Sequence, residues 1–297
     1  MNENDCIFIS SRGILKSCDI HSLTPFSSAE QLYNYDFSKL KENCTIYVCN
    51  KAIPAFTNII DKINNRFILV SGDCDVTVPN GIFTTEEHFF YLINSDKLIH
   101  WYAQNCVYEH PKITKLPIGL DYHTLSFTNP YSIDWGEKKT PQNQEQQLIK
   151  IKNNSLSFWE REMKCYSNFH FIPITDFRKD AVSKLDKDIM VYETMKTTRL
   201  NCWENQSKYT FIISPHGGGL DCHRTWEGLL LGCIVIVKTS PLDSMYEDLP
   251  VLIVDDWNYI TDELLIKTIN DYKTKTFNYE KLLLKYWMDK ITNVKTI

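Results

Sequence analysis

The sequence predicts an α/β fold with two Rossmann-like halves. Short apolar runs rich in β-branched residues alternate with amphipathic segments along most of the 297 residues. This alternation is typical of mostly parallel sheets with helices on both faces. The clearest example lies at 211–238, where an apolar run, three glycines, a helical pattern and a second apolar run follow one another. The length suits one large domain or two of ordinary size, and a polar stretch near the middle favours two.

The first half of the chain alternates in short segments. Thr84 or Thr85 ahead of Glu86 and Glu87 is typical of a helix start, because a hydroxyl caps the helix and acidic side chains favour its N-terminus. We expect strands at 6–10, 45–49 and 66–70, helices at 56–63 and 85–94, weak helical spacing at 28–40, and continued alternation over 97–104 and 112–121.

A polar, Gln- and Asn-rich stretch with Pro130 and Pro141 interrupts this pattern and predicts a linker. We therefore expect domains at 1–128 and 148–272, a linker at 129–147, and a final segment, 273–297, whose helix packs back on the first domain. In the second half we expect strands at 167–175, 211–213, 234–237 and 250–254, a strand or loop at 191–195, and helices at 145–153, 178–188, 201–207, 261–270 and 279–291.

The stretch at 211–238 also carries the clearest functional signal. Its three glycines allow backbone N–H groups at the helix start to approach an anion closely. His216 and Arg224 can donate to the same phosphate, and Glu227, about one turn further on, is placed to accept hydrogen bonds from a ribose. A plainer explanation is a tight turn in which Arg224 pairs with Asp221.

Two common phosphate loops are excluded by the residues present. No Gly-Lys-Ser/Thr ends the loop as in a Walker motif, and no GxGxxG is present; Lys238 stands where dinucleotide sites carry an acidic residue. The residues that we expect to bind a nucleotide donor are Arg199, Ser214, His216, Gly217, Gly218, Gly219, Asp221, Arg224, Glu227 and Lys238.

The segment SPHGGGLDCHRTWEGLLLGCIVIV at 214–237, followed by DLPV at 248–251 and DDW at 255–257, resembles the C-terminal sugar-nucleotide domain of exostosin-like (GT47-like) glycosyltransferases. The resemblance covers about residues 190–265, and the short form is most similar to the soluble xylosyltransferases of large algal viruses. It implies a GT-B fold, in which two Rossmann-like domains face a central cleft, with the acceptor bound by 1–128 and the donor by 148–272.

The resemblance also implies a reaction. Family members of this kind invert the anomeric carbon without a bound metal, and the implied donor is a nucleotide sugar, with UDP-xylose as the first choice. The implied acceptor is a sugar hydroxyl of an oligosaccharide or glycoprotein. The resemblance implies no other cofactor.

Such a transfer needs a general base for the acceptor hydroxyl. Asp73 is the first candidate and Asp75 the second, because both follow the apolar run that ends at Val70. Either carboxylate can equally cap a turn, as Asp often does. Asp73-Cys74-Asp75 also spells the Asp-x-Asp pattern with which GT-A transferases hold a metal on the donor, an alternative that leaves the glycine loop unexplained.

Two polar and aromatic clusters in the first half are candidates for contact with a sugar acceptor. His123 can also act as a base, since a neutral imidazole suits that role, although such histidines often satisfy buried backbone groups. The acceptor candidates are His100, Trp101, Gln104, Asp121 and His123.

Composition excludes some classes of partner. The net charge of −5 argues against nucleic-acid and membrane-surface binding, and no apolar run reaches the about 20 residues of a membrane span. The polar N-terminus does not resemble a signal peptide, so we expect a cytoplasmic protein, in the host cytoplasm if the chain is viral. The ten scattered cysteines lack metal-site spacing and are expected to be reduced.

The alternative to an enzyme is a non-catalytic protein that binds a nucleotide or a glycan.

Overall fold

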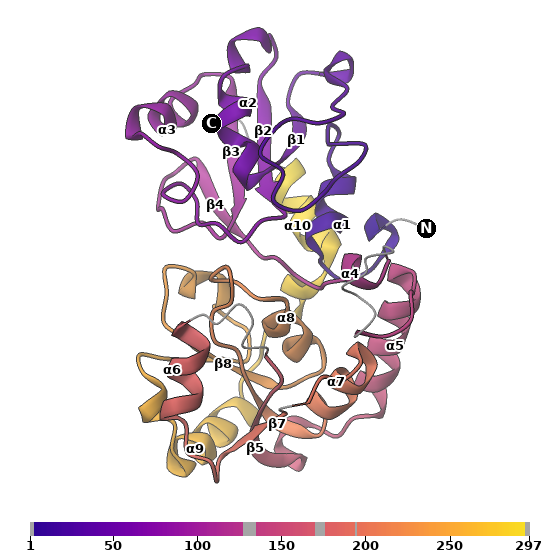
Figure 1. The fold of residues 1–297 in the computed structure, drawn as a ribbon, viewed down its shortest axis with the longest axis vertical. Helices are drawn as coiled ribbons and strands as arrows, with labels where there is room; N and C mark the ends of the chain where they lie inside the picture. Colours follow the sequence, from indigo (N-terminus) through magenta and orange to yellow (C-terminus); the bar gives the residue numbers. More distant parts are fainter. Residues whose placement is uncertain (1–2, 127–134, 170–175, 194, 295–297) are drawn as a thin grey trace. The chain divides into compact units, whose positions relative to one another are not determined.

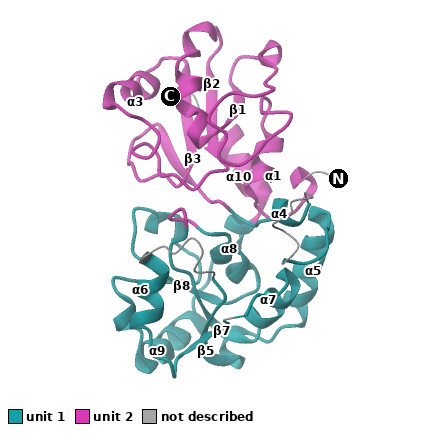
Figure 2. Ribbon diagram, in the orientation of Figure 1, with its two compact units in different colours: residues 1, 119–217, 222–282 teal, residues 2–118, 218–221, 283–297 magenta. Residues whose placement is uncertain are grey.

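The computed structural model describes residues 3–126, 135–169, 176–193 and 195–294. The chain forms two compact units (Figure 2). The N-terminal unit contains residues 2–118, Gly218–Asp221 and 283–297; the C-terminal unit contains 119–217 and 222–282. The N-terminal unit thus includes a short segment of the glycine loop and the end of the chain.

In the described part of the N-terminal unit, four parallel strands lie in the order β1-β2-β3-β4 (Figure 1). They are β1 (Cys44–Cys49), β2 (Phe67–Gly72), β3 (Leu98–Gln104) and β4 (Ile113–Leu116). Alternate side chains enter two different cores, as the two-residue period of a strand requires. Phe67 and Leu69 join one core, and Ile68 and Val70 join the other.

Helices cover both faces of this sheet. Residues of α2 (Ile53–Thr57) and α3 (Glu86–Ile93) pack into the core that holds Leu69. Residues of α1 (Ser11–Ser17) and α10 (Leu284–Thr292) pack into the core that holds Val70. The expected cap of α3 is confirmed, since the Thr85 hydroxyl accepts a hydrogen bond from His88 N.

Two sequence predictions in this unit are wrong. Residues 6–10 form no strand; Phe8 makes a single antiparallel bridge with Leu283, and Ser10 caps α1 instead. Residues 28–40 contain only the 3-10 turn Phe37–Lys39, because Ser28 and Asn34 adopt φ of 61° and 54°, which an α-helix does not permit.

In the described part of the C-terminal unit, five parallel strands lie in the order β6-β5-β7-β8-β9. They are β5 (Glu162–Ser167), β6 (Met190–Tyr192), β7 (Tyr209–Ile213), β8 (Ile234–Lys238) and β9 (Val251–Val254). The chain runs outward in opposite directions from β5 and β7. In open parallel sheets, ligands bind beyond the carboxyl ends of the strands at such a switch point.

The helices of this unit also cover both faces of the sheet. Residues of α6 (Asp176–Lys184) and α9 (Asp262–Lys273) join a core with Phe211 and Ile236. On the other face, α8 (His223–Leu230) approaches closely through Gly228, where an added Cβ would lie 3.0 Å from Val235 Cγ2. The remaining helices are α4 (His123–Ser126), α5 (Pro141–Asn154) and α7 (Arg199–Gln206).

Several boundaries differ from those expected. The Thr140 hydroxyl accepts a hydrogen bond from Asn143 N, so α5 begins at Pro141, within the stretch expected to be a linker. The strand expected at 167–175 lies earlier, at β5, and 170–175 are outside the described residues. Among the described residues, the short 3-10 helices are Glu3–Asp5, Phe37–Lys39, Asn50–Ala52, Ile60–Lys62, Phe158–Glu160, Asp243–Tyr246, Trp257–Tyr259 and Tyr279–Leu282.

The expected fold class is confirmed. Each unit is a Rossmann-like parallel sheet covered by helices, and two such units are the components of a GT-B fold. Among the helices that the structure describes, none is both long and apolar enough to cross a membrane.

Candidate functional site

The glycine loop of the C-terminal unit leaves the sheet at its switch point. Ser167, at the end of β5, donates through Oγ to Ile213 O at 3.1 Å. Ser214 N donates to Ile236 O at 2.9 Å, and the hydroxyls of Ser214 and Thr225 lie 2.8 Å apart. These bonds fix the start of the loop and the first turn of α8 at the carboxyl edge of the strands.

Two guanidinium groups lie beside this loop. Arg224, in the first turn of α8, donates through Nη2 to Pro215 O at 3.4 Å, and its buried Nε has no hydrogen-bond partner among the described residues. Arg178, from α6, lies so close to Gly217 that an added Cβ there would be 2.9 Å from Nη2. Burial lowers the pKa of Arg224, and the neighbouring Arg178 lowers it further. Since arginine stays charged, the two guanidinium groups concentrate positive charge beside the loop.

His216 completes this basic group. Its ring is buried and meets Phe177 edge-on, with ring centroids 5.4 Å apart. The guanidinium of Arg224 lies 5.3 Å from the Phe169 ring centroid. The sequence indicated His216 and Arg224, but not Arg178. The helical pattern that includes Arg178 was visible, whereas its approach to the loop depends on tertiary packing.

Arg199, another expected donor contact, is engaged inside the same unit. It donates through Nη2 to Asp121 Oδ2 and through Nη1 to Glu227 Oε1, both at 2.6 Å. Trp135 and Trp203 pack against its guanidinium, 5.1 and 5.9 Å from the ring centroids. Burial alone would raise the pKa of Asp121, but the charges of His123 and Arg199 outweigh it and hold that pKa well below its usual range.

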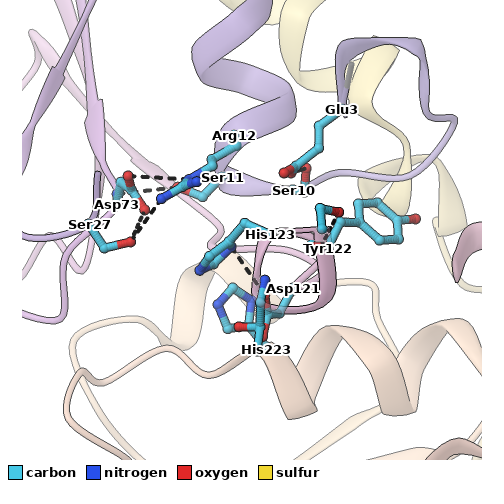
Figure 3. A network of polar contacts seen from close by, with 12 residues as sticks. Glu3, Ser10, Ser11, Arg12, Ser27, Asp73, Asp121, Tyr122, His123 and His223 are labelled. Carbon is cyan, nitrogen blue, oxygen red and sulfur yellow. Dashed lines mark hydrogen bonds and ion pairs between the residues drawn. The ribbon is translucent and has the colours of Figure 1, made fainter. Parts of the chain in front are cut away.

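A histidine pair borders this ion network (Figure 3). His123 Nδ1 lies 3.1 Å from Asp121 Oδ1, and His223 Nδ1 lies 2.7 Å from Gly119 O. The two rings meet edge-on at 5.9 Å. The structure therefore brings together Arg199, Glu227, Asp121 and His123, which the sequence assigned partly to the donor and partly to the acceptor.

Lys238 belongs to a different ion network. Its Nζ lies 3.1 Å from Asp180 Oδ2 and 3.9 Å from Asp256 Oδ2, and Lys184 binds the same two carboxylates. These contacts hold α6 to the end of β8. The predicted role of Lys238 at a phosphate therefore has a structural alternative.

In the N-terminal unit, Asp73 lies at the carboxyl end of β2 with φ of 53°. Its N–H donates to Gln104 Oε1 at 3.0 Å and to Ser11 Oγ at 3.2 Å. Ser27 Oγ donates to Asp73 Oδ1 at 2.8 Å, and Arg12 Nε lies 3.6 Å from Oδ2 (Figure 3). Arg12 is a partner that no local sequence pattern indicated.

Asp75 is exposed and packs against the segment Gly218–Asp221, which belongs to this unit. An added Cβ at Gly218 would lie 2.2 Å from Asp75 Oδ2, and one at Gly219 would lie 2.9 Å from both Asp75 O and Asn105 Nδ2. Asp221 is tied to the same edge, since its N–H donates to Asn105 Oδ1 at 2.9 Å and its Oδ2 accepts from Ile118 N at 2.8 Å. Because Gly218 and Gly219 have no Cβ, Asp75 and Asn105 can pack against them. The contact of these glycines with a phosphate stays a prediction.

Two of the expected acceptor residues are fully buried and have no exposed surface for a sugar to contact. Trp101 is fully buried in the sheet core and donates to Ser71 Oγ at 2.9 Å. Gln104 is fully buried too, accepting from Ser11 and Asp73 and donating to Pro117 O. These side chains support the Asp73 loop from within. His100 is half-buried and bonds Thr114 Oγ1 at 2.8 Å, and burial lowers its pKa.

Among the described residues, no group of three or more His, Cys, Asp or Glu side chains is arranged to hold a metal ion. Two thiols lie beside Asp73. Cys49 and Cys74 are hydrogen-bonded to each other, and Cys49 Sγ also lies 3.7 Å from Asp73 O. The hydrogen bond from Cys49 lowers the pKa of Cys74 to about 6 despite its burial.

No protein-family model and no curated protein matches this chain. The solved structures that are similar to it include two trehalose-phosphate proteins. One, from E. coli, is described as trehalose-6-phosphate bound with UDP-2-fluoro glucose; identity is 8% over 86% of this chain and 71% of that chain, with a TM-score of 0.35. The other is an α,α-trehalose-phosphate synthase (UDP-forming) from Burkholderia xenovorans in complex with glucose-6-phosphate, with 8% identity, coverage of 89% and 77%, and a TM-score of 0.36. We draw no functional conclusion from similarities at this level.

Proposed function

We propose that the protein is a glycosyltransferase that uses a nucleotide-sugar donor. The observation that carries this proposal is the approach of Arg178 and Arg224 to one glycine loop at the switch point of a parallel sheet. Two neighbouring cations repel each other, so a bound anion lowers the free energy of the site. A diphosphate is the anion that suits two guanidinium forks and a helix start.

The same groups suit catalysis of glycosyl transfer. As the bond from the anomeric carbon to the phosphate oxygen breaks, negative charge grows on the departing nucleoside diphosphate. Positive charge already in place there stabilises the transition state. The acceptor hydroxyl attacks the anomeric carbon from the opposite face and gives its proton to a base. Asp73, or else Asp75, is the base that we propose.

The finer assignment comes from the sequence. The exostosin-like segment at 214–237 supports an inverting, metal-independent enzyme, with UDP-xylose as the first donor to test and a glycan hydroxyl as the acceptor. The strand-loop-helix-strand unit from β7 to β8 favours this proposal over a GT-A enzyme that binds metal through Asp73 and Asp75, because that alternative gives the unit no role.

A thermal-shift panel with UDP, GDP, CMP and nucleotide sugars, with and without Mn²⁺, tests the donor site. A ligand that binds only the native state raises the unfolding midpoint. We expect stabilisation by UDP species without metal, and at least tenfold weaker binding in Arg224→Gln, since charge-assisted bonds are lost. Arg66→Gln, at an exposed ion pair in the other unit, is the matched control and should bind like the wild type.

Turnover assays follow with UDP-xylose and glycan acceptors. NMR of the product reports whether the anomeric carbon is inverted. Loss of activity with EDTA that Mn²⁺ restores would favour the metal-dependent alternative. UDP binding without turnover on any donor would favour a non-catalytic binder. If no nucleotide of the panel raises the unfolding midpoint at millimolar concentration, the proposal is wrong.

A further inference from the structure

A loop at residues 22–35 is tied firmly to Asp73. Ser27 Oγ donates to Asp73 Oδ1 at 2.8 Å, and Ser28 N donates to Asp73 O at 2.9 Å. The ends of the loop are joined by Leu23 N, which donates to Asn34 O at 3.1 Å. Loops of this kind, whose ends lie close together, are frequently functional. The position of this loop beside the carboxyl end of β2 is therefore set by several bonds.

The same loop exposes aromatic rings. Phe26 and Tyr33 are 49% and 46% exposed, and their ring centroids lie 5.3 Å apart at an interplanar angle of 41°. Leu23, on the same loop, is 66% exposed. Grouped apolar exposure of this kind marks binding surfaces more often than single exposed side chains do. The two rings form an apolar ledge on a loop that is held in place by polar bonds.

Next to this ledge lies a small cavity of about 20 Å³, with Phe26, Tyr33, Tyr35, Cys49 and Asp73 among its lining residues. This volume is enough for one water-sized group, and far too small for a sugar ring. Tyr35, at the end of the loop, also borders the cavity. Its hydroxyl donates to Tyr47 O of β1 at 2.9 Å. The cavity therefore has room for one hydroxyl group beside a carboxylate.

The carboxylate retains capacity for another hydrogen bond. Ser27 donates to one oxygen, and Arg12 faces the other at 3.6 Å. An ionised carboxylate has about four lone-pair sites, so an entering hydroxyl can donate to Asp73 without displacing either partner. A sugar presents two kinds of surface, an apolar C–H face and hydroxyl groups. The aromatic ledge matches the C–H face, and the cavity beside the carboxylate matches one hydroxyl group.

We propose that Phe26 and Tyr33 form an acceptor-sugar subsite, in which one pyranose ring packs on the ledge and one of its hydroxyls enters the cavity toward Asp73. The subsite rests on the proposed function for its role as an acceptor site. Burial of the C–H face against aromatic rings supplies affinity. The cavity selects a ring that directs a hydroxyl inward.

The test uses Phe26→Ala, Tyr33→Ala and Phe26→Leu, with Phe90→Ala as the matched control. Phe90 is a comparably exposed phenylalanine, 41%, on α3 of the same unit. The probes are methyl β-xyloside, methyl β-galactoside and methyl α-glucoside, observed by saturation-transfer difference NMR with the full chain. We expect transfer to ring C–H protons of at least one glycoside in the wild type and in Phe90→Ala. We expect its loss in both alanine variants and its reduction in Phe26→Leu, which keeps apolar bulk without a ring.

Kinetics give a second readout. In Phe26→Ala, the KM for a glycan acceptor should rise about tenfold, as for a central contact residue, while the KM for the donor stays unchanged. A rise in donor KM, or equal glycoside signals in Phe26→Ala and the wild type, would overturn the subsite. So would the absence of any glycoside signal in the wild type.

The two proposals fail separately. If UDP stabilises the protein and no glycoside depends on Phe26, the subsite is wrong and the donor site stands. If glycosides bind through Phe26 and no nucleotide binds, the subsite stands as a glycan-binding site and the transferase proposal falls.

Discussion

The Arg199 guanidinium donates to the Glu227 carboxylate at 2.6 Å, and both side chains are only 8% exposed. The other side of Arg199 meets Asp121, so one cation compensates two buried anions. A buried pair adds little net stability over an apolar replacement, but removal of one partner leaves an uncompensated charge. The network therefore fixes how these side chains are arranged at the start of α7 and on α8.

Arg199→Met should lower the free energy of unfolding by about 3–5 kcal/mol, because Asp121 and Glu227 lose their counter-charge. Urea denaturation at neutral pH measures the change. Arg66→Met is the control: its pair with Glu42 is exposed, and such pairs contribute at most about 1 kcal/mol. Similar losses in the two variants would contradict the role given to Arg199.

Asp121 should make stability depend on acid pH. Its pKa in the folded protein lies well below the ordinary value of about 3.9. The stabilisation from its ionised form is therefore complete above that ordinary value and is lost as the pH falls through the folded pKa. Urea midpoints from neutral pH into the acid range should fall more steeply for the wild type than for Asp121→Asn. Asp96→Asn, at an exposed site, should follow the wild type, and parallel profiles for all three proteins would exclude this contribution of Asp121.

Gly219→Ala should destabilise the N-terminal unit more than Gly218→Ala. The added Cβ at Gly219 meets a backbone oxygen, Asp75 O, at 2.9 Å, whereas the one at Gly218 meets the exposed carboxylate of Asp75, which can rotate away. Overpacking against fixed atoms costs about 1–3 kcal/mol. Urea denaturation compares the variants, and the reverse order would show that the segment relaxes easily.

The Cys74 thiol should ionise near pH 6, because Cys49 donates a hydrogen bond to its sulfur. The folded pKa lies below the ordinary value of about 8.5, so the resulting stabilisation is complete above that value and is lost as the pH falls through about 6. Thiolate ultraviolet absorbance measures the ionisation. Cys74→Ser should remove the transition, Cys49→Ala should move it to higher pH because it removes the donor, and Cys233→Ser should leave it in place. A transition unaffected by Cys74→Ser would belong to another group.

Local pattern was sufficient for much of the fold. The strands and helix from β7 to β8, and the cap at Thr85, depend on neighbours in sequence, and the structure has them where they were expected. The prediction for residues 28–40 failed because weak helical spacing does not report a left-handed backbone at Ser28.

The contacts of the candidate site were harder to predict from the sequence, because they join segments that are distant in the chain. Asp73 was visible as a carboxylate after an apolar run, but neither Arg12 nor Ser27 gave any local sign of facing it. Trp101 and Gln104 were judged by residue type, and only packing reveals that both are buried beneath the Asp73 loop. Arg178 belongs to a helix whose approach to Gly217 follows from the sheet order.

The place of α10 has a consequence for biosynthesis. Trp287 and Ile291 lie in the same core as Val70, and Leu284 N donates to Ile7 O at 2.9 Å, so this helix is part of the N-terminal unit. Domains generally fold as units while the chain is still being synthesised. Residues 44–116 leave the ribosome long before α10 exists, whereas residues 119–282 already include almost all of the C-terminal unit. The half of the protein that is translated first is therefore the half that is completed last.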